Sequence, residues 1–357
     1  MSVRCGFYLS NIGQIDDSSR QMRYDRDFIR LSGGSCETLL ELREVGDLSL
    51  VRQMFLGGES FRTWTRSRNI SLSREIHMTD DAALFTGSES KANSNHHFML
   101  CEGKTIHQFT DFWQTAPRYT IAADRLAKKS QTLEGARHFR AACREIAAAT
   151  NERTAIAAML PPGVLCGHTI NVERRPARRP NAVALILVGL MNSFPFDWLL
   201  RQKAASHVSL YLLAELPVPK FLAEVDRFLA HGTLRLSCNH QEFAPLWHEQ
   251  LGSSWREGTC RHSWPAIAKE PDRWQLRAAM DALVAQAYGL DRAQYERILG
   301  SFSHRSCKAA PALCLAAFDD LADSGLVQFC RQHDSYADIA LVTSIAEPAE
   351  SLAALTP

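Results

Sequence analysis

The chain has 357 residues, of which 46% are hydrophobic and 22% are charged. This composition is ordinary for a globular protein and excludes an intrinsically disordered or fibrous chain. The formal net charge is only +1, so any binding to nucleic acid must come from local clusters of lysine and arginine, because the chain as a whole attracts phosphate weakly.

The first 95 residues alternate short apolar patches with breaks rich in glycine and serine. This pattern predicts short strands, turns and loops with little helix. The runs HFMLCEGKTIHQF (97–109) and RYTIA (118–122) then predict strands flanking a loop. The next block, 137–160, leaves two interpretations open, because ACREIAAAT has the alanine content of a helix whereas a pair of strands also suits the pattern.

The segment VERRPARRPN (172–181) contains four arginines and two prolines and is expected to be an exposed loop. After it, residues 182–200 place Leu, Ile, Val, Met, Phe and Trp at helical spacing, which predicts one buried helix with Phe194, Phe196 and Trp198 in the core. The prolines of LPVP (216–219) end regular structure there, because each removes a backbone donor.

Residues 220–300 have a helical pattern. Gly232 and Gly289 are expected to cap two helices at their C-termini, and Asp291 to cap the next helix at its N-terminus. The run LAAFDDLADSGLVQFC (315–330) predicts a further pair of helices, followed by an extended end. The fold class is therefore α+β, with a mixed, β-containing portion followed by a mainly helical C-terminal part.

Ten cysteines occur without a regular framework or a secretory signal at the N-terminus, so we expect reduced thiols and a cytoplasmic protein. The longest apolar stretch, 182–191, is far shorter than the ~20 residues of a membrane-spanning helix, and no membrane is expected as a partner. Neither paired CxxC motifs nor HExxH occur, so the sequence gives no support for zinc.

Seven blocks resemble, in the same order, the C-terminal half of adenine-specific DNA methyltransferases of the type IIG restriction-modification and phage-exclusion kind. They extend from about residue 70 to about residue 346. The blocks are SREIHMTDDAALF, CEGKTIHQF, FRAACREIAAATNERTAIAAMLPPGVLCGH, LMNSFPFDWLLRQK, LYLLAELPVP, LRAAMDALVAQAYGLDRAQYERIL and FDDLADSGLVQFCRQHDSYADIALVTS.

The resemblance implies that residues 1–95 are a connector that follows a methyltransferase domain, that 96–219 form a target-recognition domain, and that 220–357 form a helical C-terminal region. Such a half positions double-stranded DNA before a catalytic domain flips out an adenine. The motifs for the methyl donor and the flipped base, a Gly-rich loop after a strand and [NDS]PP[YF], are absent, since LPPG (160–163) lacks the flanking residues. We therefore expect S-adenosylmethionine to bind a separate catalytic methyltransferase polypeptide, and the chain to be a separated C-terminal portion.

Several side chains are candidates for contact with DNA. Arginine forks can bind phosphates or the edge of guanine, and Asn151 can pair with adenine. An alternative holds for the block around residues 140–153, whose arginines could instead form internal salt bridges, and for the 172–181 segment, which could be a solvated connector. The candidates are Lys104, His107, Arg140, Arg144, Asn151, Arg153, Thr154, Arg174, Arg175, Arg178 and Arg179.

Two further hypotheses come from other classes. Asp80 or Asp81, with Glu102 and Lys104, has the D...ExK arrangement of Mg²⁺-dependent nucleases, in which carboxylates hold the metal and lysine activates water. The other is a non-catalytic assembly fragment, which would expose apolar patches and show no sequence preference.

Overall fold

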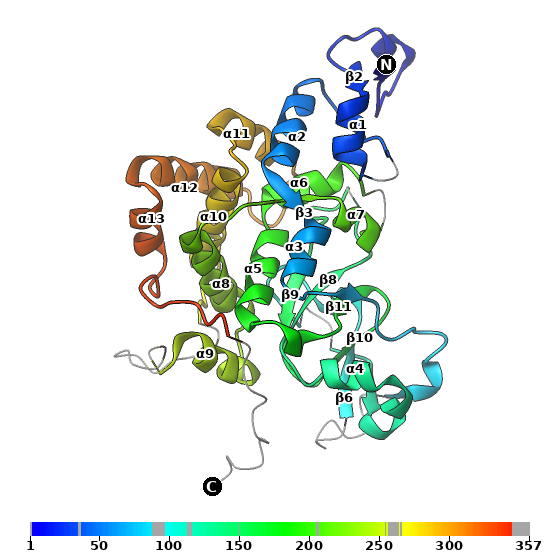
Figure 1. The fold of residues 1–357 in the computed structure, drawn as a ribbon, viewed down its shortest axis with the longest axis vertical. Helices are drawn as coiled ribbons and strands as arrows, with labels where there is room; N and C mark the ends of the chain where they lie inside the picture. The colour runs from blue at the N-terminus through cyan, green and yellow to red at the C-terminus, as the bar shows by residue number, and fades with distance from the viewer. Residues whose placement is uncertain are drawn as a thin grey trace.

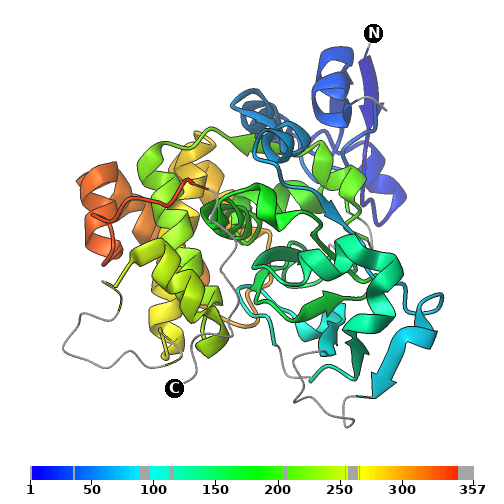
Figure 2. The same cartoon turned by 60° about the horizontal axis from the view of Figure 1, so that its bottom comes forward.

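The computed structural model describes residues 2–34, 37–87, 97–112, 116–148, 150–204, 207–253, 255, 264 and 266–344. Its fold is α+β, and the expected order of a β-containing portion followed by a helical part is confirmed. Figure 1 shows the C-terminal helices gathered on one side of the molecule, in yellow to red, and the sheets on the other side. A second view, in Figure 2, shows the same two groups separated by the green helix α5.

The N-terminal portion contains more helix than the sequence predicted, so the expectation of low helix content in residues 1–95 was wrong. Two of its helices begin at side-chain caps, where Asp25 accepts from the backbone N–H of Phe28 at 2.7 Å and Ser60 from that of Thr63 at 3.1 Å. Burial of Trp64 then fixes the third helix against the core. The elements are β1 (Ser2–Cys5), β2 (Met22–Asp25), α1 (Arg26–Gly33), α2 (Gly46–Leu56), β3 (Gly58–Ser60) and α3 (Phe61–Ser67).

Two four-stranded sheets make up most of the β structure. One has the strand order β10-β6-β7-β5 and the other β4-β11-β8-β9. The expected strands around the 97–122 loop are confirmed as β6 and β7, which pair antiparallel. The strands are β4 (Leu72–Ser73), β5 (Phe85–Gly87), β6 (His97–Cys101), β7 (Tyr119–Ala122), β8 (Arg140–Arg144), β9 (Ala157–Leu160), β10 (Val164–Cys166) and β11 (Ile170–Glu173).

The two interpretations of residues 137–160 are resolved in favour of strands. β8 pairs antiparallel with β9, with Arg140 opposite Leu160 and Cys143 opposite Ala157. All four residues of β9 are buried, and the small alanines of both strands let the helix α5 pack closely on this sheet. Burial of the sheet face thus outweighs the helix propensity of the alanines.

The expected single helix over 182–200 is two helices, α5 (Asn181–Met191) and α6 (Phe194–Arg201), which meet at an angle of 64°. The break follows from Ser193, which caps α6, and from Pro195 in its first turn. Among the described residues no single helix is long and apolar enough to cross a membrane, and this bent pair meets the length and composition test only as a pair.

The C-terminal part is helical, as expected. Gly289 has a φ of +71° just after α10, as a C-terminal cap requires, and Asp291 accepts from the N–H of Gln294 at 2.8 Å to cap α11, so both capping predictions are confirmed. This part follows a short helix, α7 (Leu210–Ala214), and a short strand, β12 (Pro217–Pro219). Its helices are α8 (Ala223–Ser237), α9 (Ala244–Leu251), α10 (Glu270–Ala287), α11 (Arg292–Gly300), α12 (Ala310–Ser324) and α13 (Leu326–His333). The expected extended end beyond residue 344 lies outside the described residues.

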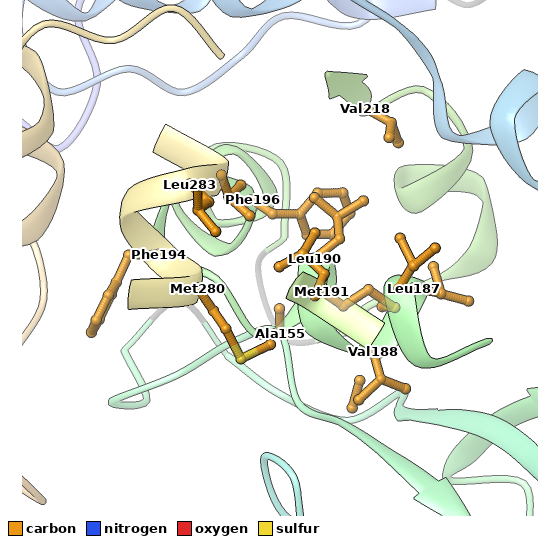
Figure 3. Close-up of a cluster of buried hydrophobic side chains, with 14 of the residues drawn as sticks. Ala155, Leu187, Val188, Leu190, Met191, Phe194, Phe196, Val218, Met280 and Leu283 are labelled. Carbon is orange, nitrogen blue, oxygen red and sulfur yellow. The ribbon is translucent and has the colours of Figure 1, made fainter. Parts of the chain in front are cut away.

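The core is built where α5, α6, α8 and α10 meet. Phe194, Phe196 and Trp198 are buried, as predicted, and Figure 3 shows the first two beside residues of α5 and α10. The prediction that Gly232 ends a helix was wrong, because α8 continues to Ser237. A Cβ at Gly232 would lie 2.6 Å from the Met280 sulfur, so this glycine permits the close approach of α8 and α10.

The expected boundary at residues 95 and 96 divides a sheet, since β5 lies before it and pairs with β7 after it. Residues on the two sides of this expected boundary therefore share one sheet. By contrast, the expected start of the helical region at residue 220 falls between β12 and α8. Eight described cysteines are free thiols.

Candidate nucleic-acid interface

The arginine-rich segment after β11 is a short, fixed loop. Its first end is held by the N–H of Arg174, which donates to the Ser71 carbonyl at 2.9 Å. Its other end is held by Arg179, whose guanidinium is buried and binds the Glu173 carboxylate at 2.5 Å. Between these points the chain makes a 3-10 turn, η6 (Pro176–Arg178), that begins with a proline. The loop is therefore held in place while Arg175 and Arg178 stay exposed.

A second arginine source lies beside this loop. The helix α3 presents Arg62 and Arg66, one helical turn apart, so that both point to the same side. Asn69 follows in the left-handed region, with a φ of +58°, a conformation that asparagine tolerates better than most residues. This turn directs the chain into β4, which pairs with β11 and thus brings α3 next to the loop.

These segments and α7 enclose an open groove of about 350 Å³, which we call the arginine groove. The described residues that line it include four arginines and no acidic residue. Arg62 binds the Glu215 carboxylate at 2.9 Å. The lining consists of Phe61, Arg62, Thr65, Arg66, Asn69, Ile70, Ser71, Leu72, Arg175, Arg178, Leu210 and Ala214.

The other three arginines of the groove, Arg66, Arg175 and Arg178, have no carboxylate within 4.0 Å among the residues that the structure describes. Their charge is therefore not neutralised by any carboxylate in the described ranges, and the groove is suited to an anionic ligand. Guanidinium groups bind phosphate through paired N–H donors in a fork, so a phosphodiester backbone is a chemically matched ligand.

Four of the sequence-predicted contact residues are buried and do not form an interface in this structure. Arg140 is fully buried and binds Glu75 at 2.7 Å, and Arg153 binds the buried Asp197, also at 2.7 Å. Arg179 is held by Glu173, as described above, and the Thr154 hydroxyl donates to the Ala148 carbonyl at 3.1 Å. The alternative of internal salt bridges is thus correct for Arg140 and Arg153. For Arg179 the alternative of a solvated connector is wrong, because its guanidinium is buried in an ion pair.

The remaining predicted residues are distributed over the surface. His107, Arg144 and Asn151 line a separate cleft, which Arg153 also borders. Arg174 points toward α4 (Ser130–Gly135), where it donates to the Thr132 hydroxyl at 3.3 Å. Lys104 is exposed, 3.8 Å from Glu102. Of the eleven candidates, only Arg175 and Arg178 thus belong to the arginine groove.

The nuclease arrangement is not assembled among the described residues. Asp81 accepts from Lys129 at 2.8 Å and Glu102 from Arg118 at 2.7 Å, so each carboxylate already has its own cation. The pKa of the Glu102 carboxyl lies below its ordinary value, chiefly because of the hydrogen bond from Arg118. Burial alone would raise the pKa of Asp81, but the hydrogen bond from Lys129 and other contacts outweigh this effect and lower the pKa. No group of three or more potential metal ligands occurs in the described part of the chain.

Sequence reasoning missed Arg62, Arg66 and Asn69. A signal was present, because the run FRTWTRSRN (61–69) contains three arginines and alternates them with two buried residues, Phe61 and Trp64. The run lay in a region predicted to contain little helix, so the shared face of Arg62 and Arg66 was not recognised. No family model matches the chain, and no curated protein matches it either.

Proposed function

We propose that the protein recognises a specific sequence in double-stranded DNA, as the target-recognition part of an adenine-specific methyltransferase of the type IIG kind. The observation that carries this proposal is the arginine groove, with its four arginines, three of them without a carboxylate partner, and its lack of acidic residues. The seven ordered blocks of sequence support the family assignment within this proposal. A catalytic methyltransferase polypeptide is the proposed partner.

The groove provides the two kinds of contact that DNA recognition needs. Arg66, Arg175 and Arg178 would bind backbone phosphates and set the position of the duplex. The exposed Asn69 offers a side-chain amide, which can pair with adenine through one donor and one acceptor. Because walls of protein flank the guanidinium groups, their field is focused in the groove although the net charge of the chain is close to zero.

The residues that the structure describes do not form a methyl-donor site of the kind that this class of enzyme uses for S-adenosylmethionine. Methyl-donor sites of this class need a Gly-rich loop at the end of a strand, usually in a parallel sheet. Among the described strands, β10 and β6 form the only parallel pair of named strands, and the 160–163 turn simply joins β9 to β10. The proposal therefore assigns the methyl donor to the catalytic polypeptide.

The test combines selection with a charge-matched mutant. The purified chain is mixed with a randomised duplex pool at two salt concentrations, and the bound DNA is sequenced. An enriched motif that persists at the higher salt supports base readout. Binding without enrichment, which vanishes as salt rises, contradicts it.

The groove is tested by the triple variant Arg66→Gln, Arg175→Gln and Arg178→Gln. The slope of log K against log salt is negative, and losing three phosphate contacts makes it less steep by about 2.7. The control variant, Arg4→Gln, Arg23→Gln and Arg26→Gln, removes the same charge from exposed positions in β1, β2 and the start of α1. Equal slopes for the two variants would exclude the arginine groove as the DNA site.

A second candidate function is supported by the N-terminal portion. Val3, Tyr8, Ile12 and Ile15 are exposed there, Ile12 by 84%. An apolar surface of this kind is typical of protein contacts, which favours an assembly fragment with no sequence preference of its own. Ile12→Ser with Ile15→Ser should then abolish association with a catalytic polypeptide while DNA selection by the purified chain yields no motif.

A further inference from the structure

A second hollow, larger than the arginine groove and with a different lining, is a cleft of about 660 Å³. One wall is formed by the 107–111 turn, Arg144, residues 150–153 and Ile156 of the β-containing portion, and the other includes residues of α10 and residues 305–306 of the helical part. The volume lies in the range of small-molecule and cofactor sites, about 300 to 1,000 Å³. A nucleotide fits this space, whereas a duplex does not.

Three guanidinium groups in this cleft have no carboxylate within 4.0 Å in the described part of the chain: Arg144, Arg277 and Arg305. Arg144 is anchored by donating to the Ile106 carbonyl at 2.8 Å. Arg277 lies between two rings, with its guanidinium carbon 4.7 Å from the centroid of Trp274 and 5.3 Å from that of Phe109. Both groups are thus oriented before any ligand arrives.

The acidic side chains of the cleft already have partners. Asp111 lies 2.7 Å from the His240 ring nitrogen, and Glu152 accepts from the backbone and hydroxyl of Ser306 at 2.8 and 2.6 Å. Glu270 lies 3.6 Å from Arg273. Ser306 is neutral, so Glu152 keeps its negative charge. The described lining nevertheless has a surplus of positive charge, because it holds three acids and five arginines, Arg144, Arg153, Arg273, Arg277 and Arg305.

The electrostatic state of His107 agrees with this surplus. Its pKa falls to about 4, first because the ring is partly buried and then because Arg144, Arg277 and Arg153 repel a further positive charge. Burial and the neighbouring Arg153 and Arg273 lower the pKa of Arg277 to about 10, so that guanidinium stays charged at neutral pH. Both shifts are consistent with the surplus of arginines in the lining of the cleft.

The loop that carries Asn151 is held firmly at the rim. Arg201 donates to the carbonyls of Asn151 and Glu152 at 2.6 and 2.5 Å, and the 154–155 backbone is bound by Asp197. The Asn151 side chain is exposed at this rim. It can therefore offer a donor and an acceptor to a base without rearrangement of the backbone.

We infer that this cleft binds a nucleoside phosphate, either free or as a nucleotide of a single strand, with Arg144, Arg277 and Arg305 on the phosphate and Asn151 beside the base. Single-strand sites elsewhere combine arginine with aromatic side chains in the same way. The inference rests on the cleft alone and does not need the duplex site in the arginine groove.

The experiment measures binding of three probes to the full chain: a ten-nucleotide single strand of mixed sequence, dAMP and pyrophosphate. The cleft variant is Arg144→Gln with Arg305→Gln, and the charge-matched control is Arg4→Gln with Arg23→Gln. Arg305 lies on an exposed loop, and Arg305→Gln alone serves as a second variant that preserves the fold. Each lost charge-assisted hydrogen bond to phosphate weakens binding about tenfold or more, so the double variant should lose about a hundredfold.

Single-strand or dAMP binding that falls in the cleft variants, but persists in the control and in the triple variant of the arginine groove, supports the inference. Tighter binding of the strand than of dAMP identifies a strand as the source of the nucleotide, and equal binding identifies a free nucleotide. Absence of binding to both probes, or equal affinity in the cleft and control variants, overturns the inference. Pyrophosphate that binds as tightly as dAMP overturns the role given to the base. Loss of duplex binding alone would bear only on the proposed function.

Discussion

Removal of the Asp197 carboxylate should destabilise the protein severely. This fully buried group binds Arg153 at 2.7 Å and accepts from the N–H groups of Thr154 and Ala155 at 3.1 and 2.9 Å. In Asp197→Ala, Arg153 becomes an uncompensated buried charge, and breaking such a pair costs about 3–5 kcal/mol. Each N–H left without an acceptor adds about 1–3 kcal/mol.

Relaxation makes these terms less than additive, so we expect a loss of at least about 4 kcal/mol in the free energy of unfolding. That loss is a large part of the ~5–15 kcal/mol typical of a native protein. Equilibrium unfolding in urea, followed by circular dichroism, measures the loss from the shift of the midpoint. The control is Asp319→Ala, which breaks the exposed pair with Arg292 and should cost less than about 1 kcal/mol. An Asp197→Ala protein within about 1 kcal/mol of the parent would refute the reasoning.

Three further outcomes are expected. Burial raises the pKa of Asp226 from its ordinary 3.8 to about 6, so the charged carboxylate destabilises the folded state above pH 6 but not below pH 4. Asp226→Asn should therefore raise the free energy of unfolding at pH 7.5 by at most about 3 kcal/mol. No gain at pH 7.5, or an equal gain at pH 4, would contradict this prediction. Thiol labelling at pH 8, with peptide mapping by mass spectrometry, should modify the half-buried Cys307 in the native protein. Cys101 and Cys143 should react only after unfolding, because burial raises the pKa of both thiols to about 12. A Cβ at Gly58 would lie 2.5 Å from the Val218 carbonyl oxygen of β12, so Gly58→Ala should lower the free energy of unfolding by about 1–3 kcal/mol. The control is Gly87→Ala, where a Cβ meets no atom within 4 Å. Equal thermal stability of the two variants would count against the close approach of β3 and β12.

The sequence predicted those features that depend on neighbours along the chain. Gly289 ends α10 because its own backbone has a positive φ, and Asp291 begins α11 through a bond to a residue three positions away. The prediction that Gly232 ends a helix was wrong because this position needs a glycine for a different reason. A side chain there would collide with Met280, which lies on α10. In α1 the capping Asp25 is a local signal for a helix, but the Gly- and Ser-rich breaks of residues 1–95 favour turns and loops.

The difference between contacts along the chain and contacts across the fold also explains why the sequence did not identify the residues of the candidate site. Arginine content identified candidate segments, but it could not separate arginines that support the fold from arginines that line a groove or cleft. Arg140 is neutralised by Glu75, 65 positions away in the chain, and Arg153 by Asp197, 44 positions away. Neither partner is adjacent in sequence, so only the tertiary structure identifies them.

Arg140 and Arg144 show how a single strand separates these roles. They lie four residues apart on β8, so the alternation of the strand places both on one side of the sheet. At the first position the Glu75 carboxylate approaches, and the guanidinium is buried in an ion pair. At the second position the guanidinium donates to the Ile106 carbonyl and lines the cleft. Because a carbonyl does not cancel a full charge, Arg144 keeps a positive field that a phosphate can use, whereas Arg140 does not.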